Sequence, residues 1–260
     1  MIYNILNISK TGLKSMENKM DAVSDDLANV NTTGYKSKNI SFQELLINEI
    51  YDNEVLMSEN GRPAGINAGS RSGVGTIDFQ QGRIRPSEGE FHMSIMGDGF
   101  FGVRDEEDNL MLTRNGGFHL NEDLTISDDS GYFLDFISYI PIDEWGEGEV
   151  FISAQGDITK EVDDETLLLG RVILYNPEVL DSLIPLGEGR YTVADGVELY
   201  DSTYDSEGFG DIIQYSLEDS NVDMTKSIVE MITAQRAYSM NGKVIQTTDD
   251  ILDMINNIKR

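Results

Sequence analysis

The most regular hydrophobic pattern in the chain covers its last 39 residues, from Val222 to Arg260. Two rows of mostly apolar residues recur there at intervals of seven: Met224, Met231, Tyr238, Ile245 and Leu252, and beside them Ala237, Val244, Ile251 and Ile258. Such rows form a seam along one side of a helix, and no proline interrupts this stretch. A helix from Val222 to Ile258 would be about 55 Å long at ~1.5 Å per residue. Its seam therefore needs a partner of similar length.

The start of this helix carries capping signals. Ser220, followed three residues later by Asp223, predicts a capping box, and Asn221 is a second candidate for the cap. Gly242 interrupts the helix interior at a cost of about 1 kcal/mol relative to alanine. Close approach of another backbone would explain this glycine, and so would simple tolerance.

A matching pattern occupies the first thirty residues. Mostly apolar residues alternate there in steps of four and three: Ile2, Leu6, Ser9, Leu13, Met16, Met20, Val23, Leu27 and Val30. This is a heptad seam of about four repeats, and the turn formers between Asn29 and Gly34 predict where its helix ends. Gly12 interrupts this helix as Gly242 interrupts the other, and either close approach of another backbone or simple tolerance would explain it. We expect the two terminal helices to pair, although two ordinary amphipathic helices packed on a globular core would show similar patterns.

The middle of the chain has a different pattern. It holds all five prolines and most of the 25 glycines, and short alternating stretches in it predict β-strands. These strands are expected at residues 91–95, 100–103, 110–113 and 171–175, with turn clusters between them. Residues 41–51 are expected to add a short helix, and residues 53–75 an extended or flexible connector. The predicted fold is therefore α+β, with paired terminal helices and an inserted antiparallel β domain.

The net charge of −28 is concentrated in this middle region. Residues 1–40 carry five basic and four acidic side chains, and residues 222–260 carry five of each. An acidic middle disfavours nucleic-acid binding because it would repel a phosphate backbone. The chain also lacks cysteine and any long apolar run, which excludes disulfides and predicts no membrane span. The first ten residues do not have the composition of a cleavable signal peptide.

None of the candidate chemical motifs is convincing. Gly97 to Gly102 matches the dinucleotide pattern G-x-G-x-x-G, but an expected strand and four acidic residues follow it instead of a helix, so a β-turn is the better interpretation. His92 and His119 are the only histidines and make a weak case for a metal. The acidic runs do not have the spacing of a calcium loop. We expect no catalytic residue, no cofactor and no metal.

Several terminal motifs resemble those of the bacterial flagellar rod and hook proteins. The stretch from Leu27 to Lys36 resembles the signature that closes the N-terminal helix of that family. The segments Ser220–Asp223, Gln235–Tyr238 and Lys243–Thr247 resemble the entry and the core of its C-terminal helix. Gly97–Phe101 looks like the opening of the family's β domain. The chain length is more like that of the rod branch, and the stretch from Gly65 to Gly82 resembles the connector of its distal members, with the proximal members as the alternative.

The resemblance implies a structural subunit of the flagellar rod that self-assembles into a hollow helical shaft and transmits torque. It implies that the subunit forms a homo-polymer and contacts neighbouring rod and hook proteins. It also implies that the subunit leaves the cytoplasm through the flagellar export apparatus without a cleaved signal peptide. The expected domains are residues 1–40 with 216–260 for polymerisation, 41–75 as connector, and 76–215 as β domain. The family motif maps onto Asn29, Asn31, Gly34, Asn221, Gln235, Arg236 and Gln246. The self-assembly seam is expected to comprise Leu6, Leu13, Met16, Met20, Val23, Leu27, Met224, Met231, Tyr238, Ile245 and Leu252.

One alternative function keeps the helices but changes the role of the middle domain. A secreted β-domain enzyme or binding module acting on cell-wall glycan could carry helical oligomerisation arms. It would require a cleft with a catalytic carboxylate.

Overall fold

The computed structural model describes residues 2–47, 66–73, 75–146, 148–162, 165–203 and 208–258. The chain divides into two compact units, each built from segments that are distant in sequence. The first unit contains residues 1–28, 38–76 and 223–260, and the second contains residues 29–37 and 77–222.

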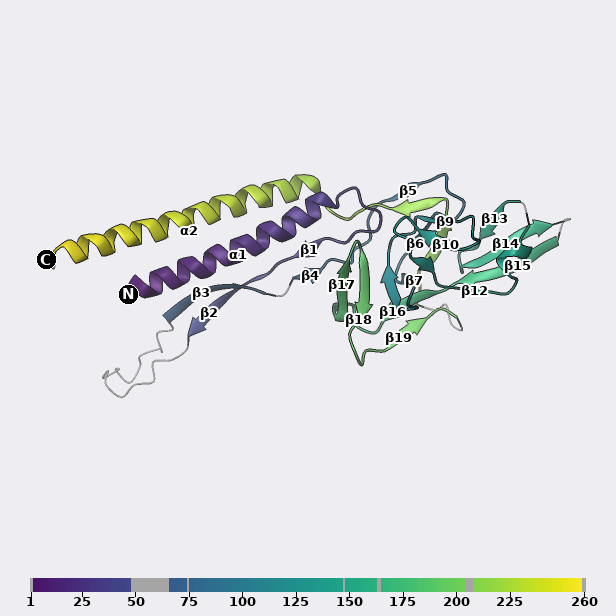
Figure 1. The fold of residues 1–260 in the computed structure, drawn as a ribbon, viewed down its shortest axis with the longest axis horizontal. Coiled ribbons are helices and arrows are strands. Elements are labelled where there is room, and N and C mark those ends of the chain that lie inside the picture. Colours follow the sequence, from purple (N-terminus) through teal and green to yellow (C-terminus); the bar gives the residue numbers. More distant parts are fainter. Residues whose placement is uncertain are drawn as a thin grey trace. The chain divides into compact units, whose positions relative to one another are not determined.

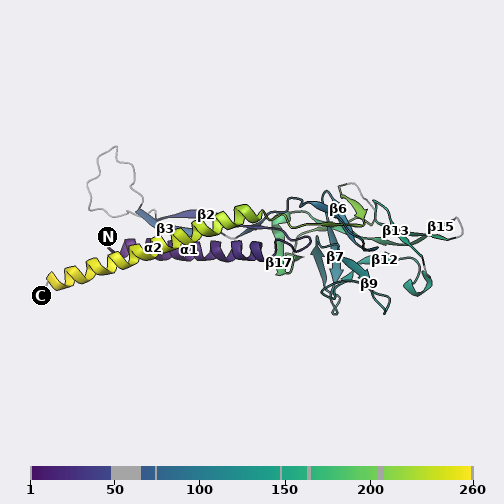
Figure 2. The same cartoon turned by 90° about the horizontal axis from the view of Figure 1, so that it is seen from above.

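The first unit is organised around two long helices, α1 (Ile2–Ala28) and α2 (Met224–Ile258). They lie side by side and run in opposite directions, with the N-terminus and the C-terminus at the same end of the pair (Figures 1 and 2). Pairing of the terminal helices was predicted from the two seams and is confirmed. α1 ends where the turn formers begin, and Gly34 adopts the left-handed conformation, with φ of +69°.

The start of α2 differs from the predicted capping box. The Asp223 side chain accepts a hydrogen bond from the Lys226 amide at 3.1 Å, so Asp223 itself is the cap and the helix begins at Met224. The Ser220 hydroxyl accepts a hydrogen bond from the nearby Val222 amide. The Asn221 side chain bonds to the backbone of Ser37 and Asp78 and does not cap the helix. The prediction erred by one turn because several adjacent residues can all act as caps.

Four short strands complete the first unit. β2 (Phe42–Ile47) pairs antiparallel with β3 (Ile66–Ser72), and β3 packs on α1. β1 (Lys38–Asn39) pairs with β4 (Thr76–Ile77). The short helix expected at residues 41–51 is wrong for residues 42–47, because pairing with β3 supplies backbone partners that so short a helix would lack. Most of the expected connector, residues 48–65 and 74, lies outside the described residues.

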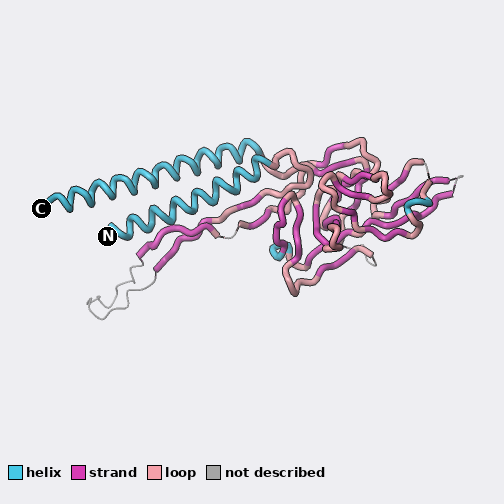
Figure 3. The backbone as a smooth tube through the Cα atoms, viewed as in Figure 1, coloured by secondary structure: helices cyan, strands magenta, loops and turns pink. Residues whose placement is uncertain are grey.

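The second unit is an antiparallel β structure, as the strand and turn pattern predicted. Its helices, in the described part, are only two short 3-10 turns, Ile142–Glu144 and Leu180–Ser182 (Figure 3). The larger sheet has the order β17-β18-β8-β7-β11-β10-β9, with β16 paired to both β7 and β19. Its strands are β7 (Phe100–Arg104), β8 (Leu110–Thr113), β9 (Phe118–Leu120), β10 (Ile126–Asp128), β11 (Phe133–Leu134), β16 (Leu174–Pro177), β17 (Leu183–Gly187), β18 (Arg190–Val193) and β19 (Leu199–Asp201).

A smaller sheet and two strand pairs complete the second unit. The smaller sheet has the order β12-β15-β14-β13, and the pairs are β20 with β6 and β21 with β5. The strands are β5 (Ile84–Pro86), β6 (Met93–Met96), β12 (Phe136–Ser138), β13 (Val150–Ile152), β14 (Asp157–Val162), β15 (Glu165–Val172), β20 (Asp211–Gln214) and β21 (Ser216–Glu218). The main core lies among Met93, Phe101, Ile158, Leu169 and Val172, all of which are completely or almost completely buried.

The segment that matches the dinucleotide pattern is a turn between two strands. Gly97 and Gly99 have φ values of +118° and +123° and link β6 to β7, and no helix follows them. Such φ values are accessible mainly to glycine, which explains both residues without a ligand. The pattern therefore falls on a short bend and the start of a strand, and the helix that a dinucleotide site requires is missing from this described segment.

Candidate assembly surface

The residues that α2 buries are small or polar. On α2 the buried residues Ser227, Ala234 and Thr248 recur at multiples of seven, and Asn241 occupies the remaining place in this row. α1, which packs on both α2 and β3, buries Ser9, Ser15 and Ala22 among others. Small side chains allow two helices to pack closely.

The register of the pair is set by two contacts along its length. Gly12 lies so close to Asn241 that a Cβ atom at Gly12 would be 2.9 Å from the Asn241 Nδ2 atom. The Lys19 Nζ atom is 3.1 Å from the Glu230 carboxylate. Arg236, a residue of the family motif, and Tyr238, a residue of the expected seam, are both exposed in this subunit.

The predicted seam of α2 therefore lies on either side of the helix contact and not at its centre. The row of small residues that contains Ser227, Ala234 and Thr248 has an apolar row on each side of it. One of these rows contains Met231 and Ile245, and the other contains Val244 and Ile251. Met231, Ile245 and Leu252 are half-buried, but Met224 and Tyr238 are exposed, which corrects the prediction that the large apolar residues form the inner contact. The partner helix approaches closest over the smallest side chains, and the larger ones are displaced to both sides.

The predicted seam of α1 is covered more completely. Val23 is buried, and Leu6, Leu13, Met16, Met20 and Leu27 are half-buried. α1 packs on both α2 and β3, whereas α2 packs mainly on α1. The side chains of Ile2 and Ile258 lie outside the described residues.

As a result, α2 presents a long apolar surface that this unit does not cover. We call it the α2 apolar face, and it consists of exposed residues along the whole helix: Met224, Ile228, Val229, Ile232, Tyr238, Met240, Val244, Ile251, Met254 and Ile255. Met240 is 68% exposed and Val244 40%. Ten large apolar side chains left exposed on one helix indicate a protein interaction site.

The two helix glycines differ in what surrounds them, and this gives a matched pair of predictions. A Cβ atom at Gly242 would meet nothing within 4 Å, whereas at Gly12 it would displace the Asn241 side chain. Gly242→Ala is therefore expected to stabilise α2 by up to ~1 kcal/mol, and Gly12→Ala to gain less or nothing. Thermal unfolding followed by helical circular dichroism would measure the difference. An equal gain in both variants would show that the close approach at Gly12 has no energetic consequence.

The second unit contains a buried ion cluster that the sequence did not reveal. We use this name for Lys36, Arg114 and Glu218, whose side chains are 1%, 5% and 1% exposed. Lys36 Nζ donates to Glu218 Oε1 at 2.6 Å and to the Gln80 carbonyl at 2.8 Å, and Arg114 Nη1 lies 3.5 Å from Glu218 Oε2. Burial lowers the pKa of Lys36, and the adjacent Glu218 carboxylate partly offsets that effect; burial likewise lowers the pKa of Arg114. The three charges hold together segments 182 positions apart in sequence.

Two residues of the family motif join these same segments. Asn221 accepts a hydrogen bond from the Ser37 amide at 2.8 Å and donates to the Asp78 carbonyl at 2.7 Å. The Gly34 amide donates to the Glu218 carbonyl at 2.8 Å, and a Cβ atom at Gly34 would lie 2.4 Å from the Arg114 backbone. Only glycine fits there. The segment after α1 and the segment before α2 therefore run side by side in the second unit.

The remaining motif residues do not converge on this place. The Asn29 carbonyl accepts from the Thr32 amide just after α1 ends, and Asn31 is exposed. Gln235, Arg236 and Gln246 are exposed on α2. The adjacent acids Asp25 and Asp26 both accept hydrogen bonds from Lys38. The Lys38 ammonium group donates to Asp25 at 3.0 Å, and the Lys38 backbone amide donates to Asp26 at 3.0 Å. These acids therefore have a local role in holding the segment at Lys38 against α1.

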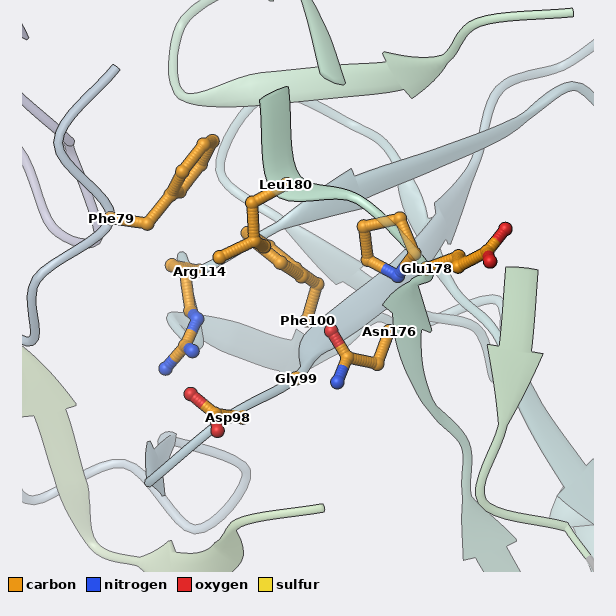
Figure 4. Close-up of a pocket in the computed structure, with 9 residues that line it drawn as sticks. Phe79, Asp98, Gly99, Phe100, Arg114, Asn176, Glu178 and Leu180 are labelled. Carbon is orange, nitrogen blue, oxygen red and sulfur yellow. The ribbon is translucent and has the colours of Figure 1, made fainter. Parts of the chain in front are cut away.

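The second unit also has a small surface pocket of about 240 Å³. In Figure 4 the Arg114 guanidinium and the Asp98 carboxylate face each other below Phe79, Phe100 and Leu180. The pocket is smaller than the ~300–1,000 Å³ usual for small-molecule sites. Its walls bring together no nucleophile and base.

The two histidines take part in local contacts. His92 Nδ1 lies 2.6 Å from the Ser87 hydroxyl, and His119 lies 3.7 Å from Asp129. In the described part of the chain, no three histidine, aspartate or glutamate side chains gather as metal ligands would. The described helices also include none long and apolar enough to cross a membrane.

Comparison with known proteins gives the family. Three family models match separate parts of the chain: "Flagella basal body rod protein" over residues 6–36, "Flagellar hook protein FlgE/F/G D1 domain" over 94–160, and "Flagellar basal body rod FlgEFG protein C-terminal" over 213–258. The flagellar basal-body rod protein FlgG of Borreliella burgdorferi is 30% identical over an alignment of 258 positions that covers 96% of each chain. The chain belongs to the flagellar basal-body rod protein family.

Other full-length relatives support the same assignment. The FlgG protein of Buchnera aphidicola is 31% identical over 257 residues, covering 95% of this chain and 96% of the relative. The flagellar hook-basal body complex protein FlhP of Bacillus subtilis is 25% identical over the full length of both chains. Within the family the chain is most like the distal rod protein. It is a structural subunit of the flagellar rod in the basal body, from a family not known for enzymes, and the cell-wall enzyme alternative finds no support.

Proposed function

We propose that this rod subunit assembles with copies of itself through the α2 apolar face and forms a hollow helical shaft that transmits torque. The observation that carries the proposal is the mismatch between the two faces of α2. α1 covers the inner face of α2, while ten large apolar residues remain exposed on the same helix. Complete burial of one such side chain contributes roughly 1.5–3 kcal/mol. A neighbouring copy can bury the part that is still in contact with water.

The proposal extends to the partners that the family implies. The ends of the shaft would contact neighbouring rod and hook proteins, and the subunit would reach its place through the flagellar export apparatus without a cleaved signal peptide. Membership of the rod family and the resemblance of the terminal motifs support both parts of this proposal. The seam residues proposed for self-assembly are those of α1 and α2 named above, with the exposed residues of α2 as the primary contact.

Electron microscopy of the purified full-length protein tests the proposal directly. Filaments or tubes are the expected result. They should form more readily as ionic strength rises from ~0.01 to ~0.15 M, because salt screens the repulsion between copies that each carry a net charge of −28. Sedimentation at each salt concentration measures the polymer fraction. A chain that remains monomeric at high concentration under all these conditions contradicts self-assembly.

A further inference from the structure

The second unit has an uneven distribution of exposed charge. Its sequence segments contain 33 acidic and eight basic residues. Six of the eight basic side chains are buried or half-buried: Lys36, Arg104, Arg114, Lys160, Arg171 and Arg190. The only exposed basic side chains in the described part of this unit are Arg83 and Arg85.

These two arginines form a single basic site at the strand β5, labelled in Figure 1: Arg83 immediately precedes the strand, and Arg85 lies within it. They are two positions apart and therefore point to the same side of an extended segment, away from half-buried Ile84. Arg85 Nε donates to Asp219 at 2.6 Å, and its two terminal amino groups make no further ion pair within the described residues. Arg83 forms no ion pair with any described residue. Along its strand edges β5 pairs with β21, and the described strands include none on its other side.

A complementary acidic site lies on the turn between β7 and β8. The Asp105 carboxylate accepts hydrogen bonds from the Glu107 and Asn109 amides, both at 2.9 Å, and from the Asn109 side chain. These bonds lower the pKa of Asp105, so it remains an anion that holds the turn in shape. Arg104 contacts Asp108 at 3.2 Å. Glu106 and Glu107 are exposed, and in the described structure neither is part of an ion pair.

We propose that Arg83 and Arg85 of one subunit bind Glu106 and Glu107 of a second copy of this chain, an inference that rests on the self-assembly proposed above. Two different sites of one molecule then meet, which is a heterologous contact, and such contacts generate open helical polymers when the rotation does not close. The attraction would also favour some orientations of neighbours over others, since contacts that leave both arginines out bring acidic surfaces together.

Charge reversal and its rescue test this contact in the full-length chain at ~0.15 M ionic strength. Arg83→Glu with Arg85→Glu is expected to raise the critical concentration for polymer formation at least about tenfold, a change of ~1.4 kcal/mol. Glu106→Lys with Glu107→Lys should raise it similarly. The combination of all four changes should return it to within about threefold of the wild type, because the pair is restored with its signs exchanged.

The controls separate this contact from general charge effects. Glu122→Lys with Asp195→Lys changes the net charge as much as Glu106→Lys with Glu107→Lys but lies elsewhere on exposed loops, so it should not impair assembly. Arg83→Gln with Arg85→Gln should give a smaller loss than the reversal and guards against misfolding caused by a glutamate beside Asp219. The competing explanation is that Arg83 and Arg85 only protect the edge of β5 from pairing with another strand. In that case their replacement by glutamates would leave polymer formation unchanged.

Two outcomes would overturn the inference. One is normal polymerisation of the variant with Arg83→Glu and Arg85→Glu, and the other is a fourfold variant that assembles no better than either double variant. A wild-type chain that forms no polymer refutes the proposed function itself. Loss of assembly confined to the reversed variants, with rescue, supports both proposals.

Discussion

Val244→Asp is expected to abolish polymer formation while leaving the subunit folded. Val244 belongs to the α2 apolar face and is 40% exposed, so in one subunit an aspartate there can still reach water. In a polymer that covers this face the carboxylate would lose its hydration without gaining a partner, which costs several kcal/mol. A loss of only ~3 kcal/mol would already raise the critical concentration more than roughly 100-fold. Sedimentation and electron microscopy measure the effect.

The matched control for this prediction is Ser239→Asp. Ser239 is also exposed on α2, and its neighbours one turn away along the helix have no large apolar side chain: Gln235, Arg236, Gly242 and Lys243. The new charge is the same and the helix is the same, so only the location differs. Val244→Leu should also assemble normally, because it retains an apolar side chain. If Val244→Asp assembles as well as Ser239→Asp does, the α2 apolar face is not the assembly surface.

Glu218→Ala is expected to destabilise the second unit by about 3–5 kcal/mol, the usual cost of breaking a buried ion pair from one side. The reason is that Lys36 and Arg114, which are 1% and 5% exposed, would both lose their carboxylate partner within the protein interior. The Gly82 amide would also lose its hydrogen bond to Glu218 Oε1, which is 2.8 Å long. Urea unfolding followed by the fluorescence of Trp145, the only tryptophan and a buried residue of this unit, measures the change.

The neighbouring residue provides the comparison. Asp219 forms an ion pair with Arg85 at 2.6 Å, the same distance as between Lys36 and Glu218, but its side chain is 40% exposed. Solvent screens such a pair, so Asp219→Ala should cost no more than about 1 kcal/mol. The difference between the two variants isolates the effect of burial at nearly the same place. Similar losses for both would mean that water reaches the ion cluster in solution.

Local sequence signals were sufficient for the two long helices and for several strands and turns. Long periodic runs without proline predicted both helices, because residues repeated every seven positions fall on one side of an α-helix. The turn at Gly34 and the turn at Gly97 and Gly99 were predicted because glycine readily adopts positive φ values. The cap of α2 was misplaced, and residues 42–47 were assigned to a helix, because several caps or a short apolar run are compatible with more than one local structure.

The contacts that distinguish the candidate sites depended on residues far apart in sequence. Lys36 stood within a recognised motif, but nothing near it indicated that Glu218 and Arg114 would surround it. The row of Ser227, Ala234, Asn241 and Thr248 was visible in the sequence at seven-residue spacing, yet it lies between two apolar rows, and a hydrophobic pattern favours the larger residues. Its role became evident only from its position against Gly12.

The sequence by itself determined the two terminal helices, the antiparallel β structure between them and the family, because each depends on short-range periodicity, turn residues or motifs. Only the tertiary structure decided which side of α2 faces its partner helix, which charges are buried, and that two arginines are exposed among the described residues of the acidic second unit. The physical reason is that burial depends on what surrounds a side chain, and here those surroundings come from segments as much as 182 residues away.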